Sequence, residues 1–189
     1  YLYKYLAHRT FRGWCGVPYY EVRTAEDGQQ KHWEGHFEEQ VEIDKEYGKY
    51  EKIDVPAFED VRKSTILHDF EKNFTAIVDM ADARCYVMPL NRKLVRPPKD
   101  FWDLISKLRS GYYLPDAELV KENFQVQQPP LTNLSPFGYY IWRDCRRYDS
   151  YLLQKIQHQP IAMVKRSACK PFKTEFSTGI PVMWNIYDC

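Results

Sequence analysis

Several features that mark common functional classes are missing from these 189 residues. There is no Cys-x-x-Cys pair and the five histidines are scattered, which argues against zinc-ribbon and thiol-redox motifs. There is no glycine-rich phosphate loop and no internal repeat. The 27 basic and 26 acidic residues give a net charge of +1, so no long-range field favours nucleic acid. We expect no metal, no cofactor and no nucleic-acid partner.

The sequence also lacks a long apolar run. The first six residues, YLYKYL, are far too few to span a bilayer, which takes about 20 apolar residues. Their tyrosines and lysine are nevertheless typical of the interfacial end of a membrane helix. A frayed aromatic tail is the alternative interpretation. Because residue 1 is tyrosine, we expect a processed or truncated chain.

Residues with catalytic chemistry do not form a recognisable site. His68 and Asp69 are adjacent and would point in different directions from a helix, and no serine or cysteine has the setting of a nucleophile. His32 and His36 are four residues apart, but Gly35 lies between them and no third ligand is evident. We interpret residues 23–49 as a solvated linker or stalk, and we expect the protein not to be an enzyme.

The sequence does contain a dense apolar and aromatic segment between Thr65 and Cys145. Aromatic residues make up 16% of the chain, and they suit either a sheet core or an exposed apolar surface. A first helix, capped by Asp60 or Ser64, is predicted from four apolar residues at i, i+1, i+4 and i+8: Ile66, Leu67, Phe70 and Phe74. A second helix opens at residues 97–100 and ends at Gly111, with this stripe on one side: Phe101, Leu104, Ile105 and Leu108.

Five segments predict strands around these helices. Residues 50–55 alternate toward Pro56, residues 75–79 are β-prone, and residues 85–90 are a buried apolar run bounded by Pro89. Residues 118–126 predict a fourth strand and the aromatic residues 137–145 a fifth, after a proline-containing loop. The predicted order is β-α-β-β-α-β-β, which is one small α+β core.

The core is also recognisable by several motifs in a fixed order. They are HDF at residues 68–70, CYVMPLN at 85–91, PPKDFWDL at 97–104, GYYLP at 111–115 and YIWRDC at 140–145. Together they resemble the BRICHOS domain, most closely in its integral membrane protein 2 (Bri) branch. The resemblance covers residues 50–147 closely. It implies a central sheet of about five strands with one helix on each face.

The same resemblance divides the chain into four parts. Residues 1–49 would be a membrane-proximal stub and stalk, and residues 50–147 the BRICHOS domain. A linker at residues 148–166 would end in a dibasic cleavage site, and residues 167–189 would be a releasable peptide. The whole would be the lumenal or extracellular region of a single-pass type II protein of the Golgi and plasma membrane, whose membrane span is missing from this chain.

The five cysteines favour a disulfide framework in the secretory pathway. We expect Cys85 to pair with Cys145 and Cys169 with Cys189, because each pair flanks one coherent unit. Cys15 is left over, in a glycine-flanked turn outside any regular element. The resemblance implies that Cys15 forms an interchain disulfide in a homodimer. An ordinary surface thiol or a bond within the chain is the alternative.

The resemblance also implies processing of the C-terminal region. Lys165 and Arg166 precede Ser167, where a proprotein convertase would cut, although Met163 stands where the optimal motif has arginine. A basic surface loop is the alternative. The released peptide is apolar and β-prone, and it offers a client strand whose apolar residues repeat with period two: Ile180, Val182, Trp184 and Ile186.

The implied function is an intramolecular chaperone that holds this C-terminal peptide and also binds β-prone or amyloidogenic peptides, such as amyloid precursor fragments. Two alternatives remain open: a carrier for a secreted cyclic peptide ligand, and a structural cell-surface module. Asn73 and Asn133 begin sequons for N-glycosylation. Asp69, expected on an apolar helix face where burial raises a carboxyl pKa, has either a structural or pH-sensing role or that of an ordinary exposed aspartate.

Overall fold

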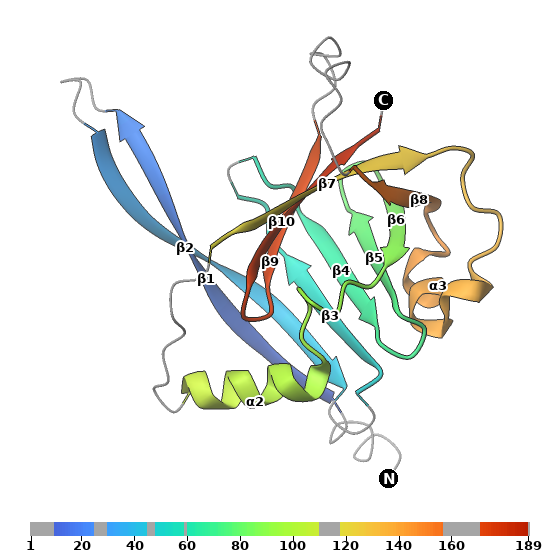
Figure 1. Ribbon diagram of the computed structural model, residues 1–189, viewed down its shortest axis with the longest axis horizontal. Coiled ribbons are helices and arrows are strands. Elements are labelled where there is room, and N and C mark those ends of the chain that lie inside the picture. The colour runs from blue at the N-terminus through green and yellow to red at the C-terminus, as the bar shows by residue number, and fades with distance from the viewer. Residues whose placement is uncertain are drawn as a thin grey trace.

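The computed structural model describes residues 10–24, 30–44, 48–58, 60–109, 118–156 and 171–188. These ranges form one ten-stranded sheet with the strand order β1-β2-β3-β4-β5-β6-β8-β7-β10-β9 (Figure 1). The strands are β1 (Thr10–Thr24), β2 (Gln30–Asp44), β3 (Tyr50–Val55), β4 (Ser64–Asp69), β5 (Phe74–Asp79), β6 (Arg84–Pro89), β7 (Val120–Gln127), β8 (Asp149–Lys155), β9 (Phe172–Ser177) and β10 (Pro181–Tyr187). The helices are α2 (Pro98–Arg109), α3 (Tyr139–Cys145) and the short 3-10 helix η1 (Ser135–Phe137).

Strands β2 to β6 run antiparallel in sequence order, and β6 then pairs with β8 in parallel. The strands predicted at residues 50–55, 75–79, 85–90 and 118–126 are confirmed as β3, β5, β6 and β7. Two turns of the meander contain a residue with positive φ, Asn73 at 61° and Ala83 at 51°. These left-handed residues reverse the chain sharply, so that short strands stack side by side.

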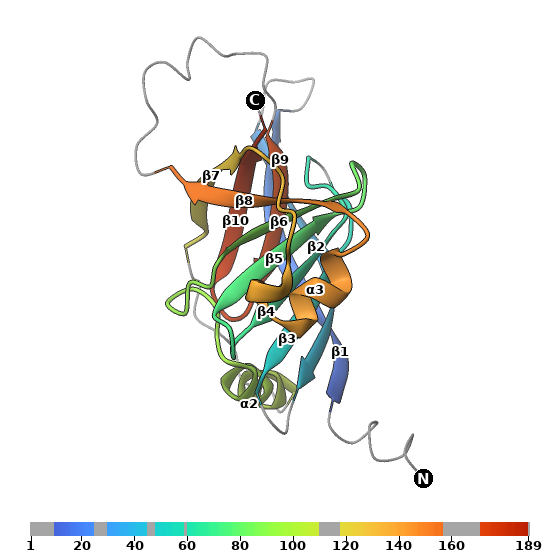
Figure 2. The same cartoon turned by 90° about the vertical axis from the view of Figure 1, so that its right-hand side faces the viewer.

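Each strand places alternate side chains on two faces, which we call the inner and the outer face. The inner face carries Ile53, Ile66 and Tyr86, and it packs against side chains of β7, β9 and β10. The outer face carries Leu67 and Cys85, and it is covered by α3 (Figure 2). Because the sheet curls, β9 contacts β3 although the two strands are far apart in the strand order.

The prediction of a first helix, at residues 66–74, is wrong. Residues 64–69 form β4, and Phe74 opens β5 after a turn. Ile66 faces inward and Leu67 outward, and both are fully buried because the sheet is covered on both faces. A strand buried on both faces has a continuous apolar run that also fits a helical spacing, so periodicity did not separate the two structures.

The strand predicted at residues 137–145 is also wrong. Residues 135–137 form η1 and residues 139–145 form α3. Ile141 and Cys145, four residues apart, are buried together on one side of α3, against the outer face. Packing of that side outweighs the β-propensity of the aromatic residues. Gly138, with φ of 98°, separates η1 from α3.

The sheet extends past both boundaries that we expected for the domain. β1 and β2 form a long antiparallel hairpin where a stalk was expected, and β8 lies within the expected linker. The sheet has ten strands and not about five, the placement of one helix on each face is not confirmed, and the fold is mostly β with few helices. The sequence of β2 is mostly polar, but alternate residues near its end are buried: Glu39, Val41 and Ile43. So short an alternation within a polar segment does not by itself predict a strand.

The helix predicted from residue 97 is confirmed as α2, which begins at Pro98 and has Asp100 in its first turn. The side chains of its predicted stripe, Phe101, Leu104, Ile105 and Leu108, lie outside the described part of the structure. None of the helices in the described ranges is long and apolar enough to cross a membrane.

Candidate functional site

The candidate site is the interface between the sheet and the C-terminal hairpin, by which we mean β9 and β10 together. β10 pairs with β7 in parallel, from Val182 opposite Val120 to Tyr187 opposite Gln125. On its other side β10 pairs with β9 in antiparallel register. β7 would therefore be an edge strand of the sheet without the C-terminal hairpin (Figure 1). This is the geometry of strand addition, in which main-chain hydrogen bonds join a segment to an existing edge.

The side chains of β10 follow the period of two predicted from the sequence. Val182, Trp184 and Ile186 are buried on the inner face, and the residues between them are partly exposed. Ile180 lies just before the strand and is partly buried against the same core. Fully burying one such apolar side chain stabilises a fold by about 1.5–3 kcal/mol, so these residues attach the hairpin firmly.

Trp184 makes the most specific contact in the interface. Its Nε1 donates a hydrogen bond to Oε2 of Glu122, its register partner in β7, at 3.0 Å. The other carboxylate oxygen of Glu122 lies 2.5 Å from Nζ of Lys155. The indole ring also packs against the rings of Phe176, at 4.5 Å between centroids, and Phe124, at 6.3 Å.

β9 contacts β4 and the segment just before it, across the inner face from β7. Thr174 Oγ1 lies 2.7 Å from Ser64 Oγ, and both side chains are buried. The backbone carbonyl of Lys173 accepts a hydrogen bond from the backbone N–H of Arg62 at 3.2 Å. Phe172 stacks on Tyr86 with 5.9 Å between ring centroids. The hairpin is thus bound on two sides, by β7 and by the β3–β4 region.

The turn of the C-terminal hairpin is fixed by the segment that follows β6. The hydroxyl of Thr178 donates to the carbonyl oxygen of Leu94 at 3.4 Å and accepts from the backbone N–H of Arg96 at 3.2 Å. Gly179 has φ of 106°, in a region that favours glycine. The turn is therefore satisfied by contacts with residues more than 80 positions earlier in the chain.

A group of buried ionisable side chains lies beneath the hairpin, on β2, β3 and β4. Burial raises the pKa of Glu51 well above its usual value, and the nearby carboxyl of Glu39 adds to the shift. Burial also raises the pKa of Glu39 well above its usual value, although its Oε2 accepts from the backbone N–H of Ser177 at 3.5 Å. Burial lowers the pKa of His68 to about 3, and its Nδ1 lies 2.9 Å from the hydroxyl of Thr75. Burial therefore favours the uncharged form of all three groups.

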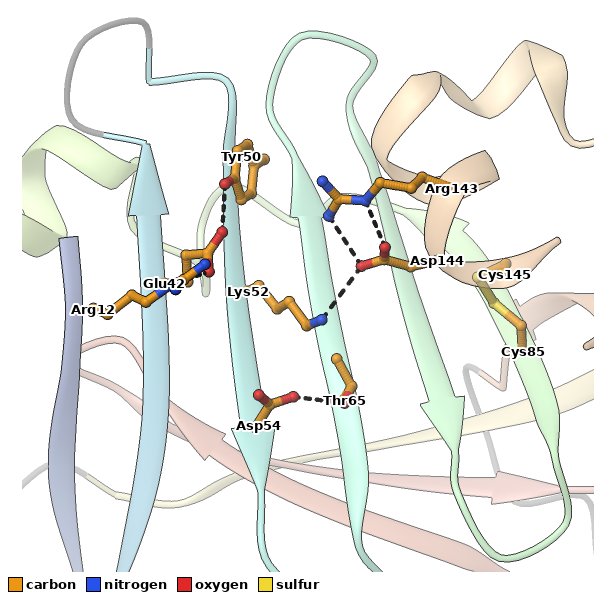
Figure 3. Close-up of polar contacts among 10 residues, drawn as sticks. All are labelled: Arg12, Glu42, Tyr50, Lys52, Asp54, Thr65, Cys85, Arg143, Asp144 and Cys145. Atoms are coloured by element: carbon orange, nitrogen blue, oxygen red, sulfur yellow. Dashed lines mark hydrogen bonds and ion pairs between the residues drawn. A yellow bond between two sulfur atoms is a disulfide. The ribbon is translucent and has the colours of Figure 1, made fainter. Parts of the chain in front are cut away.

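The outer face carries a second set of polar contacts, shown in Figure 3. Lys52 Nζ lies 3.6 Å from Oδ2 of Asp144 in α3, and Arg143 also pairs with Asp144. Tyr50 donates its hydroxyl to Oε1 of Glu42 at 2.6 Å. These contacts tie α3 to β3, and β3 to β2.

Cys85 and Cys145 form a disulfide between β6 and α3, with 5.6 Å between their Cα atoms (Figure 3). This is the pair expected from the sequence, although Cys145 comes from a helix and not from a strand. Both cysteines are fully buried among the apolar residues of the outer face. The disulfide fastens the helix to the sheet on the side opposite the C-terminal hairpin.

Asp69 ends β4 and does not lie on a helix. Its Oδ1 accepts hydrogen bonds from the backbone N–H groups of Glu71 at 3.0 Å and Lys72 at 2.8 Å, which shapes the turn into β5. Burial raises the pKa of Asp69 despite these bonds. A methyl group added at Gly138 would lie 2.7 Å from Oδ2 of Asp69, so the carboxylate packs tightly against the start of α3. The visible role is structural.

The other predicted residues are either outside this interface or outside the described residues. Asn73 and Asn133 are exposed in turns and loops, and each side chain already accepts a hydrogen bond from a nearby residue. Cys15 lies in β1 with its backbone opposite Glu39, not in a turn. Lys165, Arg166, Ser167, Cys169 and Cys189 lie outside the described residues, as do the side chains of Cys15, His32 and His36. In the described ranges, no three His, Cys, Asp or Glu side chains gather as metal ligands.

Sequence reasoning missed the polar residues of the interface: Glu39, Glu51, Ser64, Glu122 and Thr178. One signal was available, because Glu122 shares the period of two of Phe124 and Val126 and so faces inward with them. The same alternation places Glu39 with Val41 and Ile43, and Glu51 with Ile53 and Val55, but it does not identify their contacts. Their partners lie far away in the sequence, and the pairing is decided by the strand order of the sheet.

Comparisons with known proteins are consistent with this architecture. Residues 60–152 match the BRICHOS domain family. Integral membrane protein 2C from Bos taurus is 33% identical over 143 residues, which cover 75% of this chain and 51% of that protein. The same protein from Sus scrofa and from Pongo abelii is 32% identical with the same coverage. The chain thus spans about half the length of these curated relatives.

Proposed function

The chain is a BRICHOS-domain member of the integral membrane protein 2 (Bri) family, and from this premise we propose that its sheet is a chaperone for its own C-terminal segment and for other β-prone strands. Neither the domain nor the relatives represent an enzyme family, and we propose no catalytic activity. The proposal concerns a binding site that accepts an extended segment along its backbone.

One observation carries the proposal. The C-terminal hairpin adds to the edge of β7 and covers the inner face, so the segment most prone to aggregation is bound along both its backbone and its apolar side. Strand addition reads main-chain groups and apolar bulk more than detailed sequence. A site of this kind therefore accepts other extended clients, including amyloidogenic peptides such as amyloid precursor fragments.

Release of the segment is a second part of the proposal. The chain that links β8 to β9 contains Lys165 and Arg166, and we propose that a proprotein convertase cuts there and frees residues 167–189 as a peptide closed by Cys169 and Cys189. We further propose a type II protein of the Golgi and plasma membrane, dimerised through Cys15, with N-glycans at Asn73 or Asn133. The membrane span would lie outside this chain.

The experiment uses the full chain with residues 160–166 replaced by the recognition sequence of a specific protease. After cutting, the hairpin is free to exchange with strands in solution. The cut chain is then mixed at substoichiometric ratio with an unrelated amyloid-forming peptide, and fibril growth is followed by thioflavin fluorescence. We expect the cut chain to delay fibril growth more strongly than the same chain left uncut.

The uncut chain is the matched control, because its composition is identical and its hairpin stays tethered. An inert globular protein of similar size gives the baseline. If the cut chain and this baseline delay fibrils equally, the chaperone proposal is wrong and the domain is only a carrier for a secreted peptide. Circular dichroism of the cut chain verifies that the comparison is made on folded protein.

A further inference from the structure

The carboxylate of Glu122 is placed to read one side chain of a bound strand. It is almost fully buried and it lies directly beside Trp184 in the parallel register of β7 and β10. Its Oε2 receives the indole N–H at 3.0 Å, and its Oε1 faces Lys155. Both carboxylate oxygens thus have a donor, and one of these donors is supplied by the captured strand.

The surroundings of the indole select its shape as well as its hydrogen bond. The ring of Trp184 packs against the rings of Phe176 and Phe124 and is itself fully buried. Val182 and Ile186, two residues away on either side, are also fully buried on the same face. A strand with a smaller residue at position 184 would leave space in this packed set, and one without an N–H would leave a buried carboxylate oxygen without its donor.

We propose that this edge selects strands of one chemical class: an extended segment with tryptophan between two β-branched residues at positions −2 and +2, bound parallel to β7. Glu122 is the specificity-determining residue, because its carboxylate accepts the indole N–H. On the opposite face, Asn185 Nδ2 donates to Asn123 Oδ1 at 3.0 Å, so a second register contact favours asparagine after the tryptophan. This inference rests on the proposed strand capture and names the strand that is captured best.

The selectivity follows from an asymmetry in hydrogen bonding. A buried carboxylate that is left without its hydrogen-bond donor has lost its contact with water and gained nothing in return, so the complex is destabilised. Replacing both the donor and the acceptor by apolar groups is much less costly. Removal of a hydrogen bond to a charged group weakens binding by about 10- to 100-fold. Strands with phenylalanine at the paired position should therefore bind by that factor less well, even though the apolar contacts are largely kept.

The test measures peptides against the cut full chain described above. Synthetic peptides of residues 171–188 carry either tryptophan or 3-benzothienylalanine at position 184. The second residue has the shape of tryptophan with sulfur in place of the N–H, so it removes the donor and nothing else. Each peptide competes with a fluorescent copy of residues 171–188, and the dissociation constant is read from fluorescence anisotropy. We expect about 10- to 100-fold weaker binding of the benzothienyl peptide.

A variant of the chain supplies the second arm. Glu122→Met keeps the length of the side chain and removes the acceptor, so the preference for tryptophan over benzothienylalanine should vanish or reverse. Trp142→Phe, in α3 on the outer face, is a matched control that should leave the preference unchanged. Its folding and that of Glu122→Met are checked by thermal unfolding, and the peptide comparison on the unaltered chain stands even if Glu122→Met fails to fold.

The outcomes separate this inference from the proposed function. Equal binding of both peptides by the unaltered chain overturns the role of Glu122, while strand capture itself stands. An unchanged preference in Glu122→Met also overturns it. Failure of both peptides to bind the cut chain overturns the strand-capture proposal, and the selectivity with it.

Discussion

His68 and Glu51 face each other across β4 and β3, with 3.9 Å between Nε2 and Oε1, and neither side chain is exposed to solvent. Both carboxylate oxygens of Glu51 and Nε2 of His68 lack a hydrogen-bond partner among the described residues. Burial raises the pKa of Glu51 and lowers that of His68 to about 3, so burial favours the uncharged form of both groups. Phe176 of the C-terminal hairpin packs on His68 at 5.5 Å between ring centroids.

The first prediction concerns the pH dependence of stability. Glu39 and Glu51 have raised pKa values, so their contribution is fully present below pH 4.5, their unfolded value, and is lost as pH rises through the folded values. His68 has the opposite sign, because stability is lost as pH falls from 6.5 toward about 3. Above pH 6.5 the two glutamates act alone. We expect the free energy of unfolding to fall with rising pH until the folded pKa values are passed, by at most about 1.4 kcal/mol per pH unit for each glutamate that is protonated in the folded state and ionised in the unfolded state.

Urea unfolding at several pH values between 5 and 8 measures this slope. Other groups near this set are Glu175 of β9, which acts on Glu39 through its charge, and the hydroxyl of Thr75, beside His68. Glu39→Gln and Glu51→Gln should each flatten the slope and stabilise the protein at neutral pH. Asp100→Asn, in the exposed first turn of α2, is the control. A slope that survives in both glutamine variants would place its origin elsewhere.

The second prediction concerns the Cys85–Cys145 disulfide. It closes a loop with a sequence separation of 60, so in the chain-entropy model it stabilises the fold by about 4 kcal/mol. Replacing both cysteines by alanine should lower the free energy of unfolding by about this amount, because the unfolded chain then regains the conformational freedom that the closed loop had removed. A Cys15→Ser variant is the control.

A non-reducing peptide map tests the predicted disulfide pairs. A link from Cys15 to another cysteine of its own chain would contradict the predicted homodimer.

The third prediction concerns Asp69. Asp69→Ala removes the acceptor of two backbone N–H groups in the turn between β4 and β5, and we expect a loss of about 1–2 kcal/mol in the free energy of unfolding. Asp69→Asn retains an oxygen at the same place, so it should cost less. The stability of Asp69→Asn should also vary less with pH. Burial raises the pKa of Asp69, so the part of its contribution that depends on the bound proton is lost as pH rises through the folded pKa, and asparagine has no such proton. If Asp69→Asn lowers the free energy of unfolding as much as Asp69→Ala does, the two hydrogen bonds in the turn are not the cause of the loss.

The fourth prediction concerns cleavage. Arg166→Ala removes the basic residue nearest to the expected cut, so cells that express the longer protein should no longer release residues 167–189. Mass spectrometry of the secreted material, with and without reduction, detects the peptide and its disulfide. Lys173→Ala is a control, since that lysine belongs to β9 and lies beyond the cut. Continued release of the same peptide from Arg166→Ala would show that another bond is cut.

The accuracy of the sequence predictions follows from how each element is buried. β10 was predicted correctly because one of its faces is buried and the other is not, which produces a period of two at Val182, Trp184 and Ile186. β4 was missed because both of its faces are buried, so Ile66 and Leu67 adjoin without alternation. α3 was missed because seven residues are two turns of helix, too few to establish a period of 3.6.

The sequence predicts the strand β10 of the candidate site, but not the side chains that β10 and β9 contact. β10 and the Cys85–Cys145 pair follow from local patterns and from the family resemblance. The alternation of β7 indicates that Glu122 faces inward, but the contacts of Glu122 and Thr174 do not follow from it, since their partners are 62 and 110 residues away. Such pairings depend on the order of strands in the sheet, with β10 between β7 and β9, and local propensity carries no information about that order.

The last prediction concerns removal of the C-terminal hairpin. A chain that ends at residue 170 loses five fully or almost fully buried apolar side chains: Phe172, Phe176, Val182, Trp184 and Ile186. Burying each one stabilises by about 1.5–3 kcal/mol, so the loss is comparable with the whole stability of a typical domain, roughly 5–15 kcal/mol. The same truncation leaves the edge of β7 unpaired and uncovers the inner face around Ile66 and Tyr86. We expect the truncated chain to bind a hydrophobic dye, to lose its near-ultraviolet circular dichroism signal and to aggregate.

The matched control for this truncation is the full chain cut within residues 160–166, in which the hairpin is severed but present. It should unfold cooperatively at a temperature that rises with the concentration of added hairpin peptide, because a ligand that binds the folded state stabilises it by mass action. Adding the peptide of residues 171–188 to the truncated chain should likewise restore the near-ultraviolet signal. If the truncated chain unfolds at the same temperature as the full chain, the inner face does not depend on the hairpin, and the idea that an empty strand site drives capture of other clients is wrong.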